Sequence, residues 1–305
     1  MKRLLLILIV CAILTGCAPA AIVGDGYTFT DDLGRTVTVD TPQRVACLLG
    51  SFAEVWHLAG GTICAAADDA WEDFDLPLSP DAVNLGHTKS LSLEALFAAE
   101  PDFVIASCNT DVNVRWRETL EAAGIPVAYF DVSDFDDYLR MLKICTDITG
   151  RSDLYDSNGL AVQAEIDEAV EKARGRGTSP KVLYLRASAS SIRAKNSQGS
   201  VLGVMLSALG CVNIADSDAT LLETLSMEHI LIEDPDFIFF VQLGDDAEGT
   251  RENIDRFFAE NPAWASLTAV REGRVFQLDK TLYNMKPNAR WGEAYLALEA
   301  MLREN

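Results

Sequence analysis

Histidine is scarce in this sequence. Three occur among 305 residues, His57, His87 and His229, and no two cysteines have the C-x-x-C spacing of a zinc or redox site. A free metal ion needs several such ligands that converge on one point. The sequence therefore predicts no site for a naked metal ion and no cofactor.

The cysteines that follow the N-terminal segment are odd in number and show no pattern of a disulfide framework. Cys47 and Cys64 lie inside apolar, strand-like runs, so we interpret these cysteines as small buried hydrophobic residues. The spacing leaves one disulfide among them open. The residues concerned are Cys47, Cys64, Cys108, Cys145 and Cys211.

Positive charge is also scarce. The chain has 25 lysines and arginines against 46 aspartates and glutamates, which gives a formal net charge of −21. Contacts with the phosphates of nucleic acid or of an anionic membrane would work against this overall field. We therefore expect no nucleic-acid partner, and we expect membrane contact only through an anchor.

Catalytic signatures are missing as well. No G-x-S-x-G elbow, P-loop or G-x-G-x-x-G run is present, and three poorly placed histidines give little support to a Ser/His/Asp site. The sequence favours a protein that is not an enzyme. A surface-anchored enzyme on an α/β scaffold stays as an alternative, which turnover assays would separate from a binding protein.

The first residues have the pattern of a targeting segment. Met1-Lys2-Arg3 precedes the apolar stretch Leu4 to Leu14, which is too short to remain across a bilayer, so residues 1–16 are predicted to be a signal peptide. The end of this segment, Leu14-Thr-Gly-Cys17, resembles the bacterial lipobox. That resemblance implies an exported lipoprotein on the outer face of the cytoplasmic membrane, anchored through Cys17, with residues 17–26 as a tether.

The most informative feature is an internal repeat. Leu91–Ala106 and Leu225–Phe240, 134 positions apart, align without a gap. In each copy a serine, Ser92 or Ser226, stands at the N-cap position before apolar residues at helical spacing. A proline then ends the helix, and an apolar run supplies a strand of the buried, parallel kind. The chain is therefore built from two similar halves.

Each repeated helix is predicted to be amphipathic. Glu94 and Glu228 fall one residue past the first apolar position, about 100° around the helix, so both are expected to face solvent. Each is an exposed carboxylate on its own half, or else a carboxylate that only complements the helix dipole. The apolar positions of the two helices are Leu93, Leu96, Phe97, Met227, Ile230 and Leu231.

The rest of the sequence alternates strand-like runs with helical patterns, which favours an α/β fold. The length and the 49% hydrophobic content suit two domains with packed cores. Tyr27–Asp40 has the pattern of a β-hairpin around Asp32-Leu-Gly-Arg35, and Phe135–Thr149 is predicted to be a helix. Ser152–Arg174 is predicted to be one long helix of roughly 33 Å, closed by Gly175-Arg-Gly177.

Several segments resemble the substrate-binding proteins of ABC importers for iron complexes, haem and cobalamin, which form the class III periplasmic-binding-protein family. The resemblance covers nearly the whole mature chain. The segments are Asp31-Asp-Leu-Gly-Arg-Thr-Val37, Ser51 to Leu58, Gly86-His-Thr-Lys-Ser-Leu-Ser-Leu-Glu94, Gly124-Ile-Pro-Val127, Leu209-Gly-Cys-Val-Asn213, Ser226-Met-Glu228 and Lys286-Pro-Asn-Ala-Arg-Trp-Gly-Glu293.

This resemblance implies two Rossmann-like α/β lobes joined by a single long helix, with the ligand cleft between the lobes. The N-terminal lobe would span 27–150, the linker helix 151–176 and the C-terminal lobe 177–305. The resemblance also implies that Glu94 and Glu228 dock on arginines of a membrane permease, which works with an ATPase. We expect the binding protein itself to be a monomer.

Ligands of open α/β sheets bind beyond the carboxyl ends of the strands, so the strand-end loops hold the candidate contacts. Trp71 could pack on a flat or catecholate ligand, or could have only a packing role. Basic residues near the C-lobe loops would suit an anionic ferric siderophore, although ordinary surface charge is the alternative for each one. The candidate ligand-binding residues are Ser51, Trp71, His87, Thr88, Asn109, Arg186, Arg193, Lys195, Gln242, Tyr283 and Lys286.

The sequence thus predicts an exported protein that captures an iron complex, which we expect to be a ferric siderophore, and delivers it to an importer. Haem is an alternative, because one axial ligand such as His87 or Tyr283 would suffice. Cobalamin is another. A purely structural adhesion protein is disfavoured, because two matched lobes around a cleft are a binding architecture.

Overall fold

The computed structural model describes residues 26–217 and 220–304. The first described residues form the expected hairpin, in which β1 (Tyr27–Thr30) pairs antiparallel with β2 (Thr36–Val39). The buried carboxylate of Asp31 fixes the turn by accepting hydrogen bonds from the backbone N–H groups of Leu33 and Arg35. The hairpin prediction is confirmed.

The N-terminal lobe is built on a sheet of parallel strands in the order β5-β4-β3-β6-β7. The strands are β3 (Val45–Cys47), β4 (Ile63–Ala66), β5 (Val83–Asn84), β6 (Phe103–Ser107) and β7 (Val127–Phe130). The helices that connect them are α1 (Gly50–Leu58), α2 (Asp69–Glu72), α3 (Leu93–Ala98), α4 (Asp111–Arg115) and α5 (Arg117–Ala122).

The C-terminal lobe has a parallel sheet in the order β10-β8-β11-β12, and one further strand, β9, pairs antiparallel with β8. The strands are β8 (Lys181–Ala187), β9 (Ile192–Ala194), β10 (Val212–Asn213), β11 (Phe237–Gln242) and β12 (Val275–Leu278). The α-helices are α9 (Val201–Ala208), α10 (Thr220–Glu223), α11 (Met227–Glu233), α12 (Ala247–Glu260), α13 (Thr268–Arg271) and α14 (Lys280–Tyr283), and short 3₁₀ turns cover Ile214–Asp216, Pro262–Ser266 and Asn288–Arg290.

The repeated unit has the same structure in both lobes. The Ser92 hydroxyl accepts a hydrogen bond from the Ala95 N–H at 3.1 Å, and the Ser226 hydroxyl accepts one from the His229 N–H at 3.4 Å. Each unit leads from helix to central strand, α3 to β6 and α11 to β11. The predicted N-caps, the parallel strands and the internal repeat are therefore confirmed.

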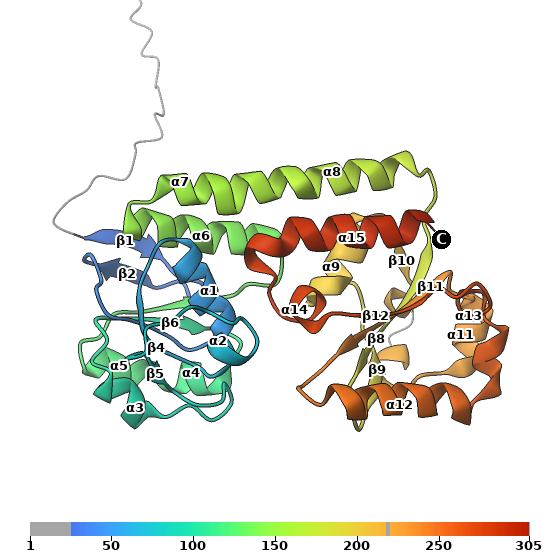
Figure 1. Ribbon diagram of the computed structural model, residues 1–305, viewed down its shortest axis with the longest axis horizontal. Helices are drawn as coiled ribbons and strands as arrows, with labels where there is room; N and C mark the ends of the chain where they lie inside the picture. The colour runs from blue at the N-terminus through green and yellow to red at the C-terminus, as the bar shows by residue number, and fades with distance from the viewer. Residues whose placement is uncertain (1–25, 218–219, 305) are drawn as a thin grey trace, which may run out of the picture.

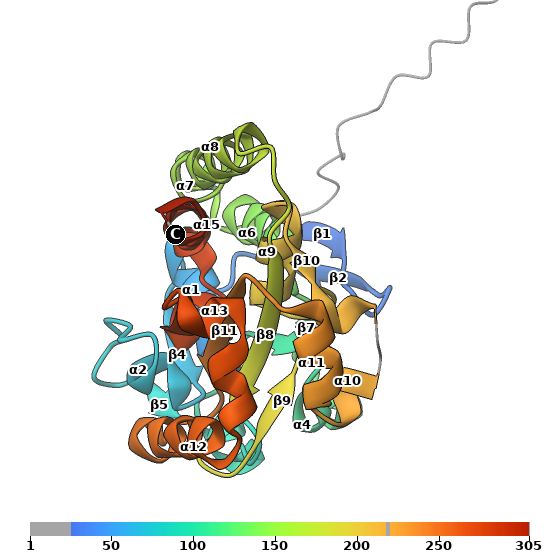
Figure 2. The same cartoon turned by 90° about the vertical axis from the view of Figure 1, so that its right-hand side faces the viewer.

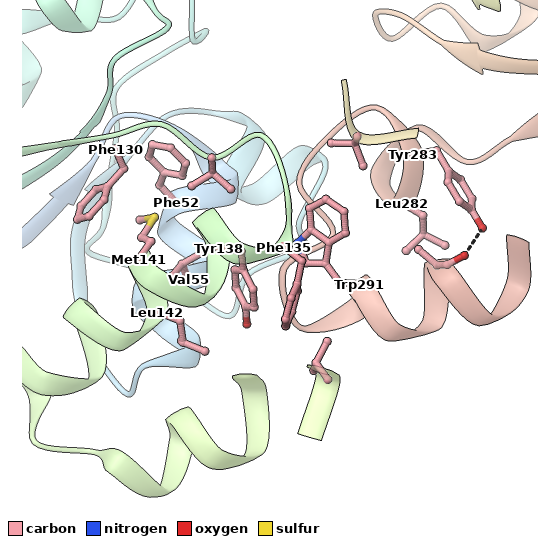
Figure 3. Packing of buried hydrophobic residues seen from close by; sticks show 14 of the residues in the cluster. Phe52, Val55, Phe130, Phe135, Tyr138, Met141, Leu142, Leu282, Tyr283 and Trp291 are labelled. Carbon is pink, nitrogen blue, oxygen red and sulfur yellow. Dashed lines mark hydrogen bonds between the residues drawn. The ribbon is translucent and has the colours of Figure 1, made fainter. Parts of the chain in front are cut away.

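Three helical segments lie along one side of the molecule (Figures 1 and 2). The long segment that contains α7 (Ser152–Tyr155) and α8 (Ala161–Gly175) runs from the N-lobe to the C-lobe, α6 (Phe135–Thr149) lies over the N-lobe, and the final helix α15 (Trp291–Glu304) lies over the C-lobe. One hydrophobic core continues from the N-lobe sheet under these helices into the C-lobe sheet. Figure 3 shows its centre, where Phe135 of α6 meets Trp291 of α15 with ring centroids 6.3 Å apart.

The long segment between the lobes differs from the single regular helix that the sequence predicts. A π-helical turn, Asp156–Leu160, interrupts it. Gly159 is buried there, and a side chain at this position would collide with Leu139 of α6. The Tyr138 hydroxyl donates a hydrogen bond to the Asn158 carbonyl at 2.7 Å, so contact with α6 explains the local change of helix type. No helix in the described part of the chain is long and apolar enough to cross a membrane.

Candidate functional site

A cavity lies at the carboxyl edge of the N-lobe sheet. The strand order reverses between β3 and β6, and in open α/β sheets such a switch point is where ligands bind. The cavity has a volume of about 450 Å³. Its lining comes from the residues just after β3, the loop after β5, and the start of α4: Leu49, Thr88, Lys89, Asn109, Thr110, Asp111, Val112 and Arg115.

Two smaller cavities lie between the lobes, and we call all three together the interlobe cleft. One of about 160 Å³ shares Thr88 and Lys89 with the first cavity and reaches Met285 of the C-lobe. The other, of about 60 Å³, lies between Glu54 of α1 and Lys286. The cleft is thus lined by both halves of the chain.

Direct contacts hold the two lobes together beside the cleft. The Lys280 ammonium on α14 lies 2.6 Å from the Asp73 carboxylate of the N-lobe and 2.7 Å from Asp245 of its own lobe. Among the described residues, Lys280–Asp73 is the ion pair that joins the lobes. The Asn288 side-chain amide adds hydrogen bonds to the Ser51 carbonyl and the Glu54 carboxylate, at 2.8 and 2.6 Å.

A group of cations lies on the β8–β9 hairpin of the C-lobe, and one of them, Arg186, is near enough to lower the pKa of Lys286 in the cleft lining. Arg186 of β8 lies directly opposite Arg193 of β9, and Lys195 follows two residues later, so the three lie on one face of the hairpin. The pKa of Lys195 is lowered by burial and by the Arg186 charge. In the described residues none of these three cations has a carboxylate within ion-pair distance, although the chain as a whole is strongly acidic.

Lys286 belongs to the same group. Burial lowers its pKa, the carboxylates of Asp131 and Asp69 oppose that shift, and the Arg186 guanidinium adds to it. Two exposed N-lobe cations, Lys89 and Arg115, line the cavity of about 450 Å³ and likewise lack an ion pair within the part of the chain that the structure describes. We call these six residues the cleft cations: Lys89, Arg115, Arg186, Arg193, Lys195 and Lys286.

The N-lobe side of the cleft is acidic by contrast. Asp68, Asp69, Glu72 and Asp73 all lie on or beside α2 and line the cavity between the lobes. Burial raises the pKa of Asp69 to about 6, and its carboxylate accepts a hydrogen bond from the Gly50 N–H at 2.8 Å. This cavity therefore combines four N-lobe carboxylates with Lys89 of the same lobe and with Asp245 and Lys280 of the C-lobe.

Four of the candidate residues from the sequence line the cavities of this cleft: His87, Thr88, Asn109 and Lys286. The Asn109 amide donates a hydrogen bond to Asp131 at 2.7 Å. Trp71 is half-buried on α2 and packs against the main core. Gln242 ends β11, where its amide donates to the Gly244 carbonyl at 2.7 Å.

Two further candidates are buried. Ser51 lies in α1. Tyr283 is also buried, and its hydroxyl donates a hydrogen bond to the Ala294 carbonyl of α15 at 3.1 Å (Figure 3). Two residues of the cleft lining lie in helices and not in strand-end loops, and the sequence did not identify them: Arg115, a full turn into α4, and Lys280 at the start of α14.

Glu94 and Glu228 occupy equivalent places on α3 and α11, both are exposed, and neither has a hydrogen-bond or ion-pair partner among the described residues. The apolar positions of the repeat differ in burial. Leu96 and Ile230 are buried, whereas Phe97 and Leu231 are 37% and 39% exposed.

The remaining predictions concern cysteines and metals. The five cysteines between residues 26 and 217 are free thiols, and Cys47 and Cys145 are buried. Cys17 lies outside the described residues, so its lipidation stays a prediction. Across residues 26–217 and 220–304, no group of three or more His, Cys, Asp or Glu side chains is placed to hold a metal ion.

Known proteins resemble this chain over most of its length. The Fe(3+)-citrate-binding protein YfmC of Bacillus subtilis (strain 168) is 24% identical over 285 residues, which are 90% of this chain and 87% of that protein. Two solved structures from Staphylococcus aureus share the fold. SirA complexed with staphyloferrin B has a TM-score of 0.66 at 19% identity, covering 91% of this chain and 97% of that one. IsdE complexed with heme has a TM-score of 0.69 at 15% identity, covering 85% and 98%.

The family assignment rests on a match to a family model. Residues 45–282, which include most of both sheets and the segment that joins the lobes, match the family described as "Periplasmic binding protein". Such proteins bind substrates for transport and are not enzymes. The two lobes, the cleft between them and this match together show that the chain belongs to the periplasmic binding protein family.

Proposed function

We propose that this protein captures an anionic ferric siderophore outside the cytoplasm and delivers it to the permease of an ABC importer. The observation that carries the proposal is the set of cleft cations. In a chain with a net charge of −21, six basic residues stand at or beside one cleft without a carboxylate partner among the described residues. A ligand with several negative oxygens would supply the missing partners.

The arrangement favours a chelate rich in carboxylate groups. Charge-assisted hydrogen bonds to carboxylates are short and strong, and arginine binds them in a bidentate way. Arg186 has a buried Nε atom without a hydrogen-bond partner within the described residues. YfmC is named for ferric citrate and SirA was solved with staphyloferrin B, and both names agree with this ligand class.

Haem is the second candidate, and His87 is the observation that favours it. His87 is exposed and lines the cavity between the lobes. Its Nδ1 atom accepts a hydrogen bond from the Lys89 N–H at 3.2 Å, which leaves Nε2 available as an axial ligand. The Tyr283 hydroxyl is occupied by Ala294, so it is the weaker axial candidate. IsdE, solved with heme, shares the fold.

The test is a binding screen on protein stripped of ligand. Ferric citrate, a ferric catecholate, haem and cobalamin are titrated separately, with tryptophan fluorescence and melting temperature as readouts. We expect ferric citrate or the ferric catecholate to quench fluorescence and raise the melting temperature. The variant Trp71→Phe should lose part of the quenching while it keeps the thermal shift. Binding of haem or cobalamin without any response to a ferric siderophore would overturn the proposal, and so would turnover of the bound chelate.

We also propose that the protein acts as a monomer and that Cys17 carries its lipid anchor. The anchor proposal rests on the Leu14-Thr-Gly-Cys17 run after the short apolar stretch. In cells, Cys17→Ala should move the protein from the membrane fraction to the soluble fraction. If that variant stays membrane-bound, the lipoprotein assignment is wrong.

Glu94 and Glu228 are proposed to dock on arginines of the permease, one from each lobe, without touching the ligand. Their exposure, their lack of partners in the described chain and their equivalence in the repeat support this role. Figure 1 shows α3 on one lobe and α11 on the other, both away from α7 and α8.

A further inference from the structure

Large apolar side chains at the surface are few and unevenly placed. In the described part of the chain seven are exposed, and three of these, Phe97, Leu231 and Ile232, lie on α3 and α11. Their exposed fractions are 37%, 39% and 72%. These two helices together contain 13 residues, 6 in α3 and 7 in α11, so exposed large apolar side chains are concentrated on a small part of the described chain.

The three residues lie beside the two proposed docking carboxylates. Phe97 follows Glu94 by three positions, and Leu231 and Ile232 follow Glu228 by three and four. Residues at these spacings are neighbours on one helix face. Phe97 and Leu231 are also 134 positions apart, so they are equivalent in the repeat. A single exposed apolar residue needs no explanation, but the same pair of carboxylate and apolar neighbour on both lobes does.

Both helices are tied firmly to their own lobes, so these faces are rigid. The Arg44 guanidinium donates hydrogen bonds to the Ala99 carbonyl at the end of α3. The Lys181 ammonium donates to the Glu233 carbonyl at the end of α11, at 3.1 Å. Rigid surfaces lose little entropy on binding, which suits a docking contact.

We propose that Phe97, Leu231 and Ile232 are apolar contacts to the permease that surround the charge pairs made by Glu94 and Glu228. This inference rests on the proposed docking role of the two glutamates. Apolar residues around a central charge pair exclude water, and a pair shielded from water attracts more strongly than one in contact with solvent. The permease surface should therefore present an apolar recess beside each docking arginine.

The experiment compares matched double variants of the full-length protein. The test variant is Phe97→Gln with Leu231→Gln. The control is Leu160→Gln with Val212→Gln, which changes two apolar residues of similar exposure, 48% and 50%, on other elements. The affinity for the detergent-solubilised importer, the melting temperature, the elution volume in gel filtration and the affinity for ferric citrate are measured for each protein.

We expect the test variant to bind the importer at least about tenfold more weakly, with the other three quantities unchanged, and the control to behave like wild type. Equal losses in both variants, or no loss in either, would overturn the inference. A change in the oligomeric state of the test variant would also overturn the inference, because Phe97 and Leu231 would then contact a second copy of this chain and not the permease.

A third double variant, Glu94→Ala with Glu228→Ala, separates this inference from the proposed function on which it rests. If the glutamate variant loses importer binding and the test variant does not, only the apolar contact is wrong. If the glutamate variant binds normally, the docking role of the glutamates is wrong, and the inference falls with it.

Discussion

The two lobes share a strand order and differ in the strand that each sheet adds to it. In the N-lobe the order β4-β3-β6-β7 corresponds to β10-β8-β11-β12 in the C-lobe, and the helices that lead into β6 and β11, α3 and α11, are capped in the same way. The N-lobe sheet adds the parallel strand β5, whereas the C-lobe sheet adds β9, which pairs antiparallel with β8 in a hairpin that carries Arg186, Arg193 and Lys195. The shared parts hold the proposed contacts to one common partner, and the hairpin added to the C-lobe carries cations that are proposed to contact the ligand.

The cleft walls extend this difference. The N-lobe wall is acidic around α2 and basic at Lys89 and Arg115, whereas the hairpin of the C-lobe carries only cations in its paired face, so an asymmetric ligand would meet different surfaces. Lys280 makes a direct ion pair with Asp73 between the walls. Asymmetry in the cleft and symmetry on the proposed docking faces would together let one orientation of cargo be presented to the permease.

The largest expected effect tests what the lobes share. The double change Glu94→Ala with Glu228→Ala should abolish uptake of the iron complex in cells. Close charge pairs between proteins can carry roughly 1.5–7 kcal/mol of coupling, whereas exposed pairs within a protein contribute under about 1, so folding should be unaffected. Uptake of radiolabelled iron, ligand affinity and melting temperature are the measurements.

The matched single variants sharpen this test of equivalence. Because the two units are alike, Glu94→Ala and Glu228→Ala alone should each reduce uptake to a similar, intermediate level. If the double variant shows normal uptake, or loses ligand affinity to the same extent, Glu94 and Glu228 only complement the dipoles of their helices.

The second prediction concerns the acidic wall, which has Asp69 at its most buried point. Its pKa is raised from 3.8 to about 6, chiefly by burial, so the folded protein binds this proton more tightly than the unfolded chain. The free energy of unfolding therefore falls as pH rises from about 4 to about 6, by about 3 kcal/mol at 1.36 kcal/mol per pKa unit. Asp69→Asn keeps an oxygen for the Gly50 N–H and removes the charge.

Asp69→Asn should accordingly raise the free energy of unfolding at pH 7 by up to about 3 kcal/mol, and should remove this part of the pH dependence. Urea unfolding at several pH values between 4 and 7 gives the measurement. Asp81→Asn, at an exposed site on the same lobe, is the control and should change stability by less than about 0.5 kcal/mol. Identical pH profiles for Asp69→Asn and wild type would contradict the prediction.

The third prediction compares the basic residues of the two lobes. Arg186→Ala or Lys286→Ala should weaken siderophore binding by about 1–3 kcal/mol each, because both are partly buried and charge-assisted contacts are strong there. Lys89→Ala and Arg115→Ala should cost less than about 1 kcal/mol, because both side chains are exposed. Isothermal titration with the ligand found in the screen provides the affinities.

Arg251→Ala is the matched control, since Arg251 is an exposed arginine on α12 that lines none of the three cavities of the cleft. Its affinity should equal that of wild type. Equal losses from both walls would remove the proposed difference between the lobes. If the C-lobe variants bind the siderophore with unchanged affinity, Arg186 and Lys286 are ordinary charged residues that do not contact the ligand.

The sequence predicts the elements of this fold well, because their signals are local. Ser92 and Ser226 are visible as N-caps, and Phe135–Thr149 has both its helical period and its bounds in the sequence. The π turn at Asp156–Leu160 has no such signal. It depends on how closely Gly159 approaches α6, which is a matter of tertiary packing.

The site is predicted less completely for the same reason. Strand-end loops are visible in the sequence, but the direction of each side chain depends on the elements around it. The short helix α14 turns Tyr283 inward to Ala294, so a residue in the right loop leaves the cleft. Arg115 lines the cleft from within α4, and a rule that considers only strand-end loops does not identify a residue inside a helix.

The smallest expected effect returns to the repeat and asks whether its two caps are equivalent in energy as well as in geometry. Ser92→Ala and Ser226→Ala each remove a hydrogen bond to an otherwise unpaired N–H in the first helical turn, which typically costs about 1 kcal/mol. The bond is 3.1 Å long at α3 and 3.4 Å at α11, so the loss should be smaller for Ser226. Urea unfolding measures both changes.

Replacement by another capping residue supplies the control. Ser92→Asp and Ser226→Asp restore an acceptor oxygen and add a charge that suits a helix start, so their stability should stay within about 0.5 kcal/mol of wild type. Because each cap orders the turn that holds Glu94 or Glu228, the alanine variants should also bind the importer slightly more weakly than the aspartate variants. A larger loss of stability for Ser226→Ala than for Ser92→Ala would show that the shorter bond is not the stronger one, and that the two copies of the repeat differ in how their helices are held.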